Sequence, residues 1–68
     1  MMFQMLDLVR LKKSNMELGV TTNMLGTVVD VSGHGKAYTV EFIDTDGNTV
    51  EEALDVLFTD DDLVPAKR

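Results

Sequence analysis

The 68-residue sequence contains no cysteine, no tryptophan, and only one proline and one histidine. Without cysteine, no disulfide framework, zinc ribbon or thiol nucleophile can form. A domain of this length buries only about 60 % of its surface on folding, so we expect one thin core held by packing alone or by a partner. Such a core leaves no room for a deep cofactor cavity beside a catalytic cleft. We therefore expect no cofactor and no enzymatic activity.

Basic residues are also scarce. Twelve acidic residues stand against six basic ones, which gives a net charge of −6 with the histidine neutral. A surface of this charge repels the phosphate backbone of nucleic acids and favours basic protein partners. The apolar runs are far shorter than the roughly 20 residues of a membrane-spanning helix, and the first residues lack the basic region and cleavage site of a signal peptide. We expect no membrane association and a cytoplasmic location.

Patterns typical of β-strands cover much of the chain. Residues 3–11 are apolar with two charged interruptions, and residues 25–32 are dense in β-branched side chains. Residues 37–43 carry large apolar side chains at every second position. Residues 49–58 predict a further strand that runs into a mixed segment, and residues 63–64 predict a short last strand ended by the proline.

The predicted core follows from this period of two. Tyr38, Val40 and Phe42 share one face of a central strand and must point inward, because a register slip of one residue would send all three into water. From neighbouring strands we expect them to meet Val9, Leu11, Val28 and Val50. Gly26, near the start of its strand, predicts a bulge or a close approach of two backbones.

Residues 12–24 have no clear period and predict a long loop. In one interpretation the loop covers one end of the core, with Met16, Leu18 and Val20 folded back onto it and Met16 and Met24 packed beneath it. In the other it is a binding loop, since loops of this length in small domains often carry function.

The remaining segments predict turns and the chain end. Residues 33–36 and residues 44–48 are rich in glycine and aspartate and predict tight hairpin connections. Residues 59–62 predict one N-capped helical turn with acidic side chains at its positive end. Residues 66–68 predict a frayed tail.

These elements predict an all-β fold in a single domain, residues 1–68, with its core within about residues 3–65. Strands at this spacing in so short a chain favour a five-stranded SH3-like barrel, with a long first loop and one short helical turn before the last strand. Closure of the barrel would remove the exposed edges through which small sheets aggregate.

Six segments form an ordered pattern over about residues 3–65. They are Leu6-Asp7-Leu8-Val9-Arg10-Leu11, Leu18-Gly19, Leu25-Gly26-Thr27-Val28-Val29-Asp30-Val31, Tyr38-Thr39-Val40-Glu41-Phe42, Asp46-Gly47 and Asp62-Leu63-Val64-Pro65. The pattern resembles the small bacterial family catalogued as domain of unknown function 4926. The resemblance implies an SH3-like barrel and a small partner-binding protein, such as an antitoxin or an immunity-type inhibitor. The segment Gly26-Thr27-Val28-Val29 also resembles the KOW motif, whose glycine bend lets a loop meet nucleic acid or protein.

No pattern for catalysis or metal binding stands out. Placing Gly47 at the sixth position of a calcium-binding loop puts Phe42 and Ala53 at ligand positions, where neither can bind a cation, so residues 44–48 favour a plain turn. His34 lies between two glycines with no nucleophile pattern beside it, which indicates an exposed turn histidine rather than a general base.

The acidic residues of the second half of the chain are the candidate partner-binding residues. They are Glu51, Glu52, Asp55, Asp60, Asp61 and Asp62. In one interpretation they form a solvated face, and in the other they form a patch that meets a basic surface of another protein. We favour a small acidic, non-catalytic binding module, for example one that neutralises a basic toxin nuclease.

Two further contacts are predicted from small groups of residues. A nucleic-acid or ribosome contact through Lys12, Lys13, Lys36 and the bend at Gly26 is the alternative function, although the net charge opposes it. Partial exposure of the N-terminal Phe3 and Met5 would favour a homodimer.

Overall fold

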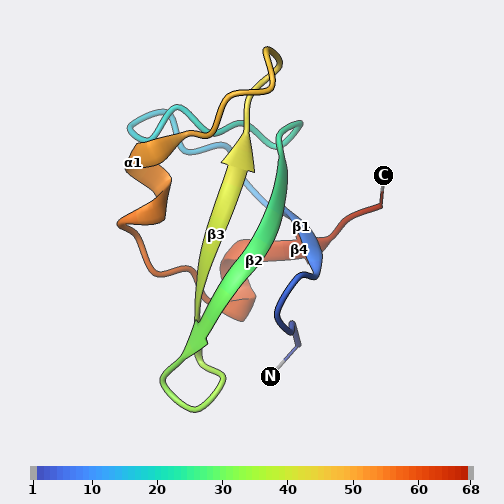
Figure 1. Cartoon of the computed structure of the whole chain (residues 1–68), viewed down its shortest axis with the longest axis vertical. Helices are drawn as coiled ribbons and strands as arrows, with labels where there is room; N and C mark the ends of the chain where they lie inside the picture. Colours follow the sequence, from blue (N-terminus) through green and yellow to red (C-terminus); the bar gives the residue numbers. More distant parts are fainter. Residues whose placement is uncertain (1, 68) are drawn as a thin grey trace.

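The computed structural model, which describes residues 2–67, is a four-stranded antiparallel sheet with one short helix and one 3-10 turn (Figure 1). The elements in chain order are β1 (Leu8–Leu11), β2 (Leu25–Ser32), β3 (Ala37–Ile43), α1 (Glu51–Leu54), η1 (Asp60–Asp62) and β4 (Leu63–Pro65). The strands lie in the order β3-β2-β1-β4. The longest helix in the described part of the chain is α1, so no helix there is long enough to cross a membrane.

Strands β2 and β3 form the long hairpin that dominates the molecule (Figure 1). β2 begins and ends where the β-branched run predicts. The turn at residues 33–36 places three consecutive residues, Gly33, His34 and Gly35, at positive φ angles of 61°, 59° and 84°. Two of the three positions hold glycine, which adopts such angles without a steric penalty, so the sequence determines this tight connection.

The alternating residues of β3 form the centre of the core, as predicted. Tyr38, Val40 and Phe42 are each fully buried. The expected partners from the other segments surround them, with Val9, Leu11 and Val28 buried and Val50 half-buried. The ring of Phe42 also packs edge to face against Phe58, with the ring centroids 5.5 Å apart.

Gly26 shows why its strand begins with a glycine. A Cβ atom at this position would lie 2.6 Å from Cγ1 of Val40 and 2.7 Å from Cε1 of Phe42. The backbone of β2 therefore approaches the core more closely than any side chain would allow. The predicted close approach is confirmed, while the irregularity in pairing lies further along, between Val28 and Asp30.

The predicted five-stranded SH3-like barrel is wrong, because the sheet has four strands and is not closed. The predicted strand over residues 49–58 is replaced by α1, flanked by single bridges from Thr49 to Ile43 and from Phe58 to Tyr38. The reason is which side chains of that segment the core can bury. A strand would place Ala53 on the same face as Glu51, whereas a helical turn buries Ala53 and leaves Glu51 in water.

The first strand is shorter than residues 3–11, because residues 4–7 form a turn before β1 begins. The amide of Asp7 donates to the carbonyl of Gln4 over 3.1 Å. The ring of Phe3 then packs edge to face on Tyr38, with the centroids 5.5 Å apart. Phe3 is only 3 % exposed, so its predicted exposure is wrong, whereas Met5 is exposed as predicted.

Residues 12–24 form the predicted loop, but only some of the residues expected to cover the core do so. Val20 is buried, and Leu18 and Met24 are half-buried against the core. Met16 was expected beneath the loop but is 76 % exposed. Asn15 and Val20 exchange backbone hydrogen bonds of 2.7 and 3.0 Å, and this small closed turn places Met16 on its outer side.

The C-terminal part confirms the capped turn. Thr59 occupies the N-cap position of η1, and its amide donates to Oδ2 of Asp62 over 2.9 Å. The amide of Ala66 donates to the carbonyl of Leu8 over 2.9 Å, so the predicted fraying does not begin at Ala66. The last residue of the predicted tail, Arg68, lies outside the described residues.

Candidate functional site

The six predicted partner-binding residues fall into two groups. Glu51, Glu52 and Asp55 belong to α1 and its C-terminal end. Residues 60–62 form η1, which the extended segment after α1 separates from the first group (Figure 1). The acidic residues are therefore not one continuous patch.

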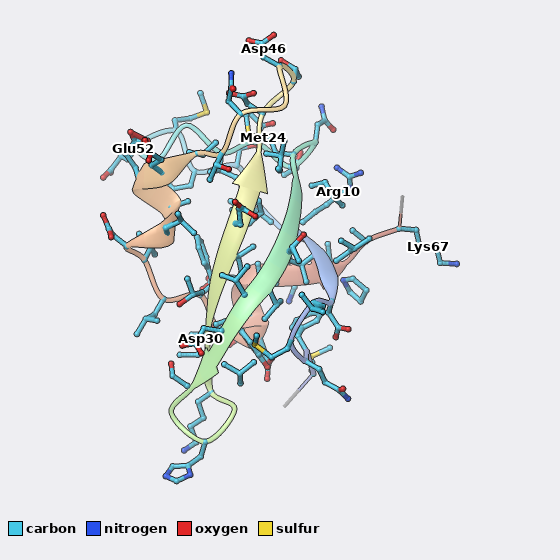
Figure 2. All side chains as sticks on the ribbon, viewed as in Figure 1. Arg10, Met24, Asp30, Asp46, Glu52 and Lys67 are labelled. Carbon is cyan, nitrogen blue, oxygen red and sulfur yellow. The ribbon has the colours of Figure 1, made fainter. Side chains whose placement is uncertain are left out.

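The carboxylates of the first group are exposed. Ala53 is the buried residue of α1, and the two glutamates in its first turn lie on the solvent side. Figure 2 shows Glu52 pointing away from the sheet. Asp55 is exposed directly after the helix, and so is Leu54. This group therefore places three carboxylates and one apolar side chain in contact with solvent.

Asp60 takes part in the fold rather than in the open surface. Its Oδ1 atom accepts a hydrogen bond of 2.6 Å from the hydroxyl of Tyr38, and the side chain is half-buried. Burial raises the pKa of Tyr38, and the hydrogen bond to Asp60 adds to this rise. Of the six candidates, Asp60 and Asp62 have structural roles, since Oδ2 of Asp62 accepts the capping hydrogen bond from the amide of Thr59.

Asp61 and Asp62 border a surface cleft that the sequence did not reveal. The cleft has a volume of about 400 Å³ and lies between the segment that follows β1 and the segment that precedes β4. Two lysines, Lys12 and Lys13, line it together with the two aspartates. The amide of Lys12 donates to the carbonyl of Asp62 over 3.0 Å, which fixes these distant parts of the chain side by side.

Apart from Asn15, the lining between these charges is apolar. It comes from Leu11, Val56, Leu57 and Phe58. Leu57 is 61 % exposed, although its neighbour Phe58 is buried in the core. The only sequence signal for this site is the apolar run of residues 56–58 before the acidic turn, and the same run also predicts part of a strand.

The residues of the predicted nucleic-acid contact do not come together. Lys12 and Lys13 follow β1, whose last residues lie beside the start of β2, while Lys36 lies in the hairpin at the far end of β2. Gly26 is buried against Val40 and Phe42, so its role is in packing and not in presenting a loop.

The turn residues considered for metal binding and catalysis have simple structural surroundings. Oδ1 of Asp44 accepts hydrogen bonds of 2.9 Å from the amides of Asp46 and of Asn48, as in a turn that an aspartate closes. His34 is exposed in the hairpin between β2 and β3. Within residues 2–67, no group of three or more histidine, aspartate or glutamate side chains is placed to hold a metal ion.

A family model described as "Domain of unknown function (DUF4926)" matches residues 5–57, which is 53 of the 68 residues. No curated protein and no solved structure gives a significant match. The matched region includes α1, both lysines of the cleft and Leu57, and it ends before η1.

Proposed function

The chain belongs to the DUF4926 family, and for this member we propose the function of a small acidic, non-catalytic protein-binding module in the cytoplasm. Its partner is another protein with a basic surface. An antitoxin or immunity-type inhibitor of a basic enzyme is the clearest example of such a protein.

The observation that carries this proposal is the acidic segment of residues 51–62, which exposes one group of carboxylates at α1 and a second at η1. This segment contains six acidic residues and no lysine or arginine. All of its carboxylates except that of Asp60 are exposed. Charge of one sign, fixed on α1 and η1, steers a partner of opposite charge and helps to set its orientation.

Exposed apolar side chains on the same segment support a protein partner. Leu54 and Leu57 both lie at the surface among the acidic residues. Apolar contacts supply most of the affinity of protein interfaces, while the surrounding charges supply specificity and association rate.

The test compares two variants that each lose three negative charges. The first carries Glu51→Gln, Glu52→Gln and Asp55→Asn on α1. The control carries Glu17→Gln, Asp30→Asn and Asp46→Asn, three exposed acidic residues outside the segment. The two variants have the same net charge, so a difference between their affinities reflects where the carboxylates were lost and not the net charge.

The wild-type chain is first used to isolate a partner from its native host, and the affinity of that purified partner is then measured. The α1 variant should bind at least about threefold more weakly than the control variant, and the difference should shrink as salt rises. Equal affinities for wild type and both variants would show that the α1 carboxylates are only a solvated face.

A nucleic-acid contact is the second proposed function, and the adjacent exposed Lys12 and Lys13 are its remaining support. A gel-shift series with single- and double-stranded probes at low salt tests it. A shift that weakens steeply with salt and disappears in Lys12→Gln/Lys13→Gln would support it. The absence of a shift at micromolar protein concentrations would exclude a nucleic-acid contact.

The proposed homodimer now has different contact residues. Phe3 is buried and cannot contribute, while Met2, Met5 and Leu6 are exposed. Sedimentation at increasing concentration tests self-association, with Met5→Ser as the variant that should remove it. A wild-type chain that stays monomeric at all concentrations would exclude the dimer.

A further inference from the structure

The cleft beside η1 has the size of a binding site. Its volume of about 400 Å³ falls within the range of roughly 300–1,000 Å³ that is usual for ligand pockets. Its walls come from two segments that are far apart in sequence, residues 11–15 and residues 56–62. Both segments are fixed by the sheet, since Leu11 pairs with Leu63 in β1 and β4.

The position of Leu57 is determined by its neighbour. Phe58 exchanges two backbone hydrogen bonds with Tyr38, of 2.7 and 2.8 Å, and its ring is buried against Phe42. Successive side chains of extended backbone point to opposite sides, so the burial of Phe58 forces Leu57 outward. The result is an exposed leucine at the cleft, where an occupant would remove it from water.

The cleft also carries both signs of charge. Asp61 and Asp62 contribute carboxylates, and Lys12 and Lys13 contribute ammonium groups. Oδ2 of Asp62 already accepts the hydrogen bond from the amide of Thr59, so Asp61 is the aspartate better able to bind a partner. A nucleic-acid backbone would meet the repulsion of these aspartates, and a purely cationic ligand would meet that of the lysines.

We propose that this cleft is the docking site for a linear peptide segment of a partner protein, in which an apolar side chain lies between one basic and one acidic side chain. The apolar side chain contacts Leu57, the basic one pairs with Asp61, and the acidic one pairs with Lys12 or Lys13. This inference rests on the proposed protein-binding function and names the chemistry that one part of the surface recognises.

The test uses four terminally blocked tripeptides as probes: Arg-Leu-Glu, Arg-Ser-Glu, Lys-Leu-Lys and Glu-Leu-Glu. Binding is followed by the shifts of backbone amide signals in two-dimensional nuclear magnetic resonance spectra. Arg-Leu-Glu should bind most tightly and shift the amides of residues 11–15 and 56–62. Each mismatched charge should weaken binding by about two- to fivefold, and Arg-Ser-Glu should bind more weakly than Arg-Leu-Glu.

Three variants locate the binding. Leu57→Ser should weaken binding of every leucine probe, whereas Met16→Ser, at an exposed methionine outside the cleft, should leave it unchanged. Asp61→Lys should reverse the preference, so that Glu-Leu-Glu binds more tightly than Arg-Leu-Glu. Circular dichroism checks that each variant is folded, and Asp61→Asn, which should only abolish the preference, replaces Asp61→Lys where it is not.

Shifts scattered outside the cleft, or equal affinity for the four probes, would overturn the proposal. The test of the cleft and the test of the proposed protein-binding function can fail independently. A partner isolated with the wild-type chain that binds Leu57→Ser and Asp61→Asn as tightly as wild type would exclude the cleft while the α1 surface remains its binding site.

Discussion

The hydroxyl of Tyr38 lies 2.6 Å from Oδ1 of Asp60, and this hydrogen bond joins the centre of the core to the acidic turn η1. The same hydroxyl accepts hydrogen bonds of 3.3 Å from the amides of Met2 and Phe3. A tyrosine hydroxyl has one proton to donate, and of its two acceptors, Oδ1 of Asp60 at 2.6 Å and the carbonyl of Gly35 at 3.3 Å, the shorter contact assigns the proton to Asp60. One oxygen thus holds the N-terminal segment and η1 against the hairpin.

Replacing Asp60 by alanine should therefore destabilise the fold. A buried hydroxyl would lose a charged acceptor, so the free energy of unfolding should fall by about 1.5–3 kcal/mol. Asp61→Ala, at the exposed neighbouring position, should change it by less than about 0.5 kcal/mol. Urea melts followed by circular dichroism measure both, and equal midpoints would contradict this role for Asp60.

The raised pKa of Tyr38 predicts a loss of stability at alkaline pH. Burial and the hydrogen bond to Asp60 raise the pKa of Tyr38 above its ordinary value of 10.0 in the folded chain. Above pH 10.0 the unfolded chain ionises first and binds fewer protons than the folded chain, so the free energy of unfolding decreases as pH rises. Below that pH this contribution is fully present.

Tyr38 is the only tyrosine and there is no tryptophan, so ultraviolet absorbance of the tyrosinate follows this one group. Its titration should lie above that of the urea-unfolded chain. Tyr38→Phe should lack this part of the alkaline decline. Superimposed titration curves for folded and unfolded chains would show that the hydroxyl is not held as described.

Phe42 should be among the most sensitive core positions. It is fully buried and packs on Phe58, so Phe42→Ala should cost about 3–5 kcal/mol, close to the whole stability of a domain of this size. Glu41→Ala removes only the acceptor of a 3.0 Å hydrogen bond from Thr49 and should cost about 1 kcal/mol. Similar urea midpoints for the two variants would contradict the assigned face of β3.

Gly26 should tolerate no side chain. Gly26→Ala would press a Cβ into Val40 and Phe42 and should destabilise by about 1–3 kcal/mol or more through overpacking. Gly19→Ala is the comparison, because its positive φ of 73° gives backbone strain while its Cβ would meet no atom within 4 Å. Crystal structures or amide spectra should show displacement around β3 only for Gly26→Ala.

Replacing Leu6 by glycine should stabilise the fold. Leu6 adopts a positive φ of 72° and is 72 % exposed, so its side chain adds backbone strain and little packing. Leu6→Gly should raise the free energy of unfolding by about 0.5–1 kcal/mol. Met5→Gly, at the preceding residue of the turn, should lower it. Destabilisation by Leu6→Gly would show that the leucine side chain makes a contact that outweighs the strain.

The sequence alone predicted the local elements that depend on neighbouring residues. The alternation of residues 37–43, the β-branched run of residues 25–32 and the glycines at residues 33–36 each predict their structure without reference to the rest of the chain. The acidic capped turn at residues 59–62 belongs to the same class. In each case propensity, period and turn chemistry favour the same structure.

Tertiary structure decided what happens where those signals conflict. Residues 49–58 have apolar side chains at both strand and helix spacing, and α1 forms because only a helical turn buries Ala53 without Glu51. With that strand replaced by α1, the sheet remains open and the barrel does not close. Phe3 is likewise a core residue because its ring packs on the ring of Tyr38, which lies 35 residues away in sequence.

For the candidate site too, the sequence determined some features and only the fold determined the others. The sequence determined which residues are acidic, and hence the sign of the surface charge. Only the fold separated α1 from η1, turned Asp60 inward to Tyr38, and brought Lys12 beside Asp62. The cleft has no specific signature in sequence because it forms where distant segments meet, as in the hydrogen bond from the amide of Lys12 to the carbonyl of Asp62.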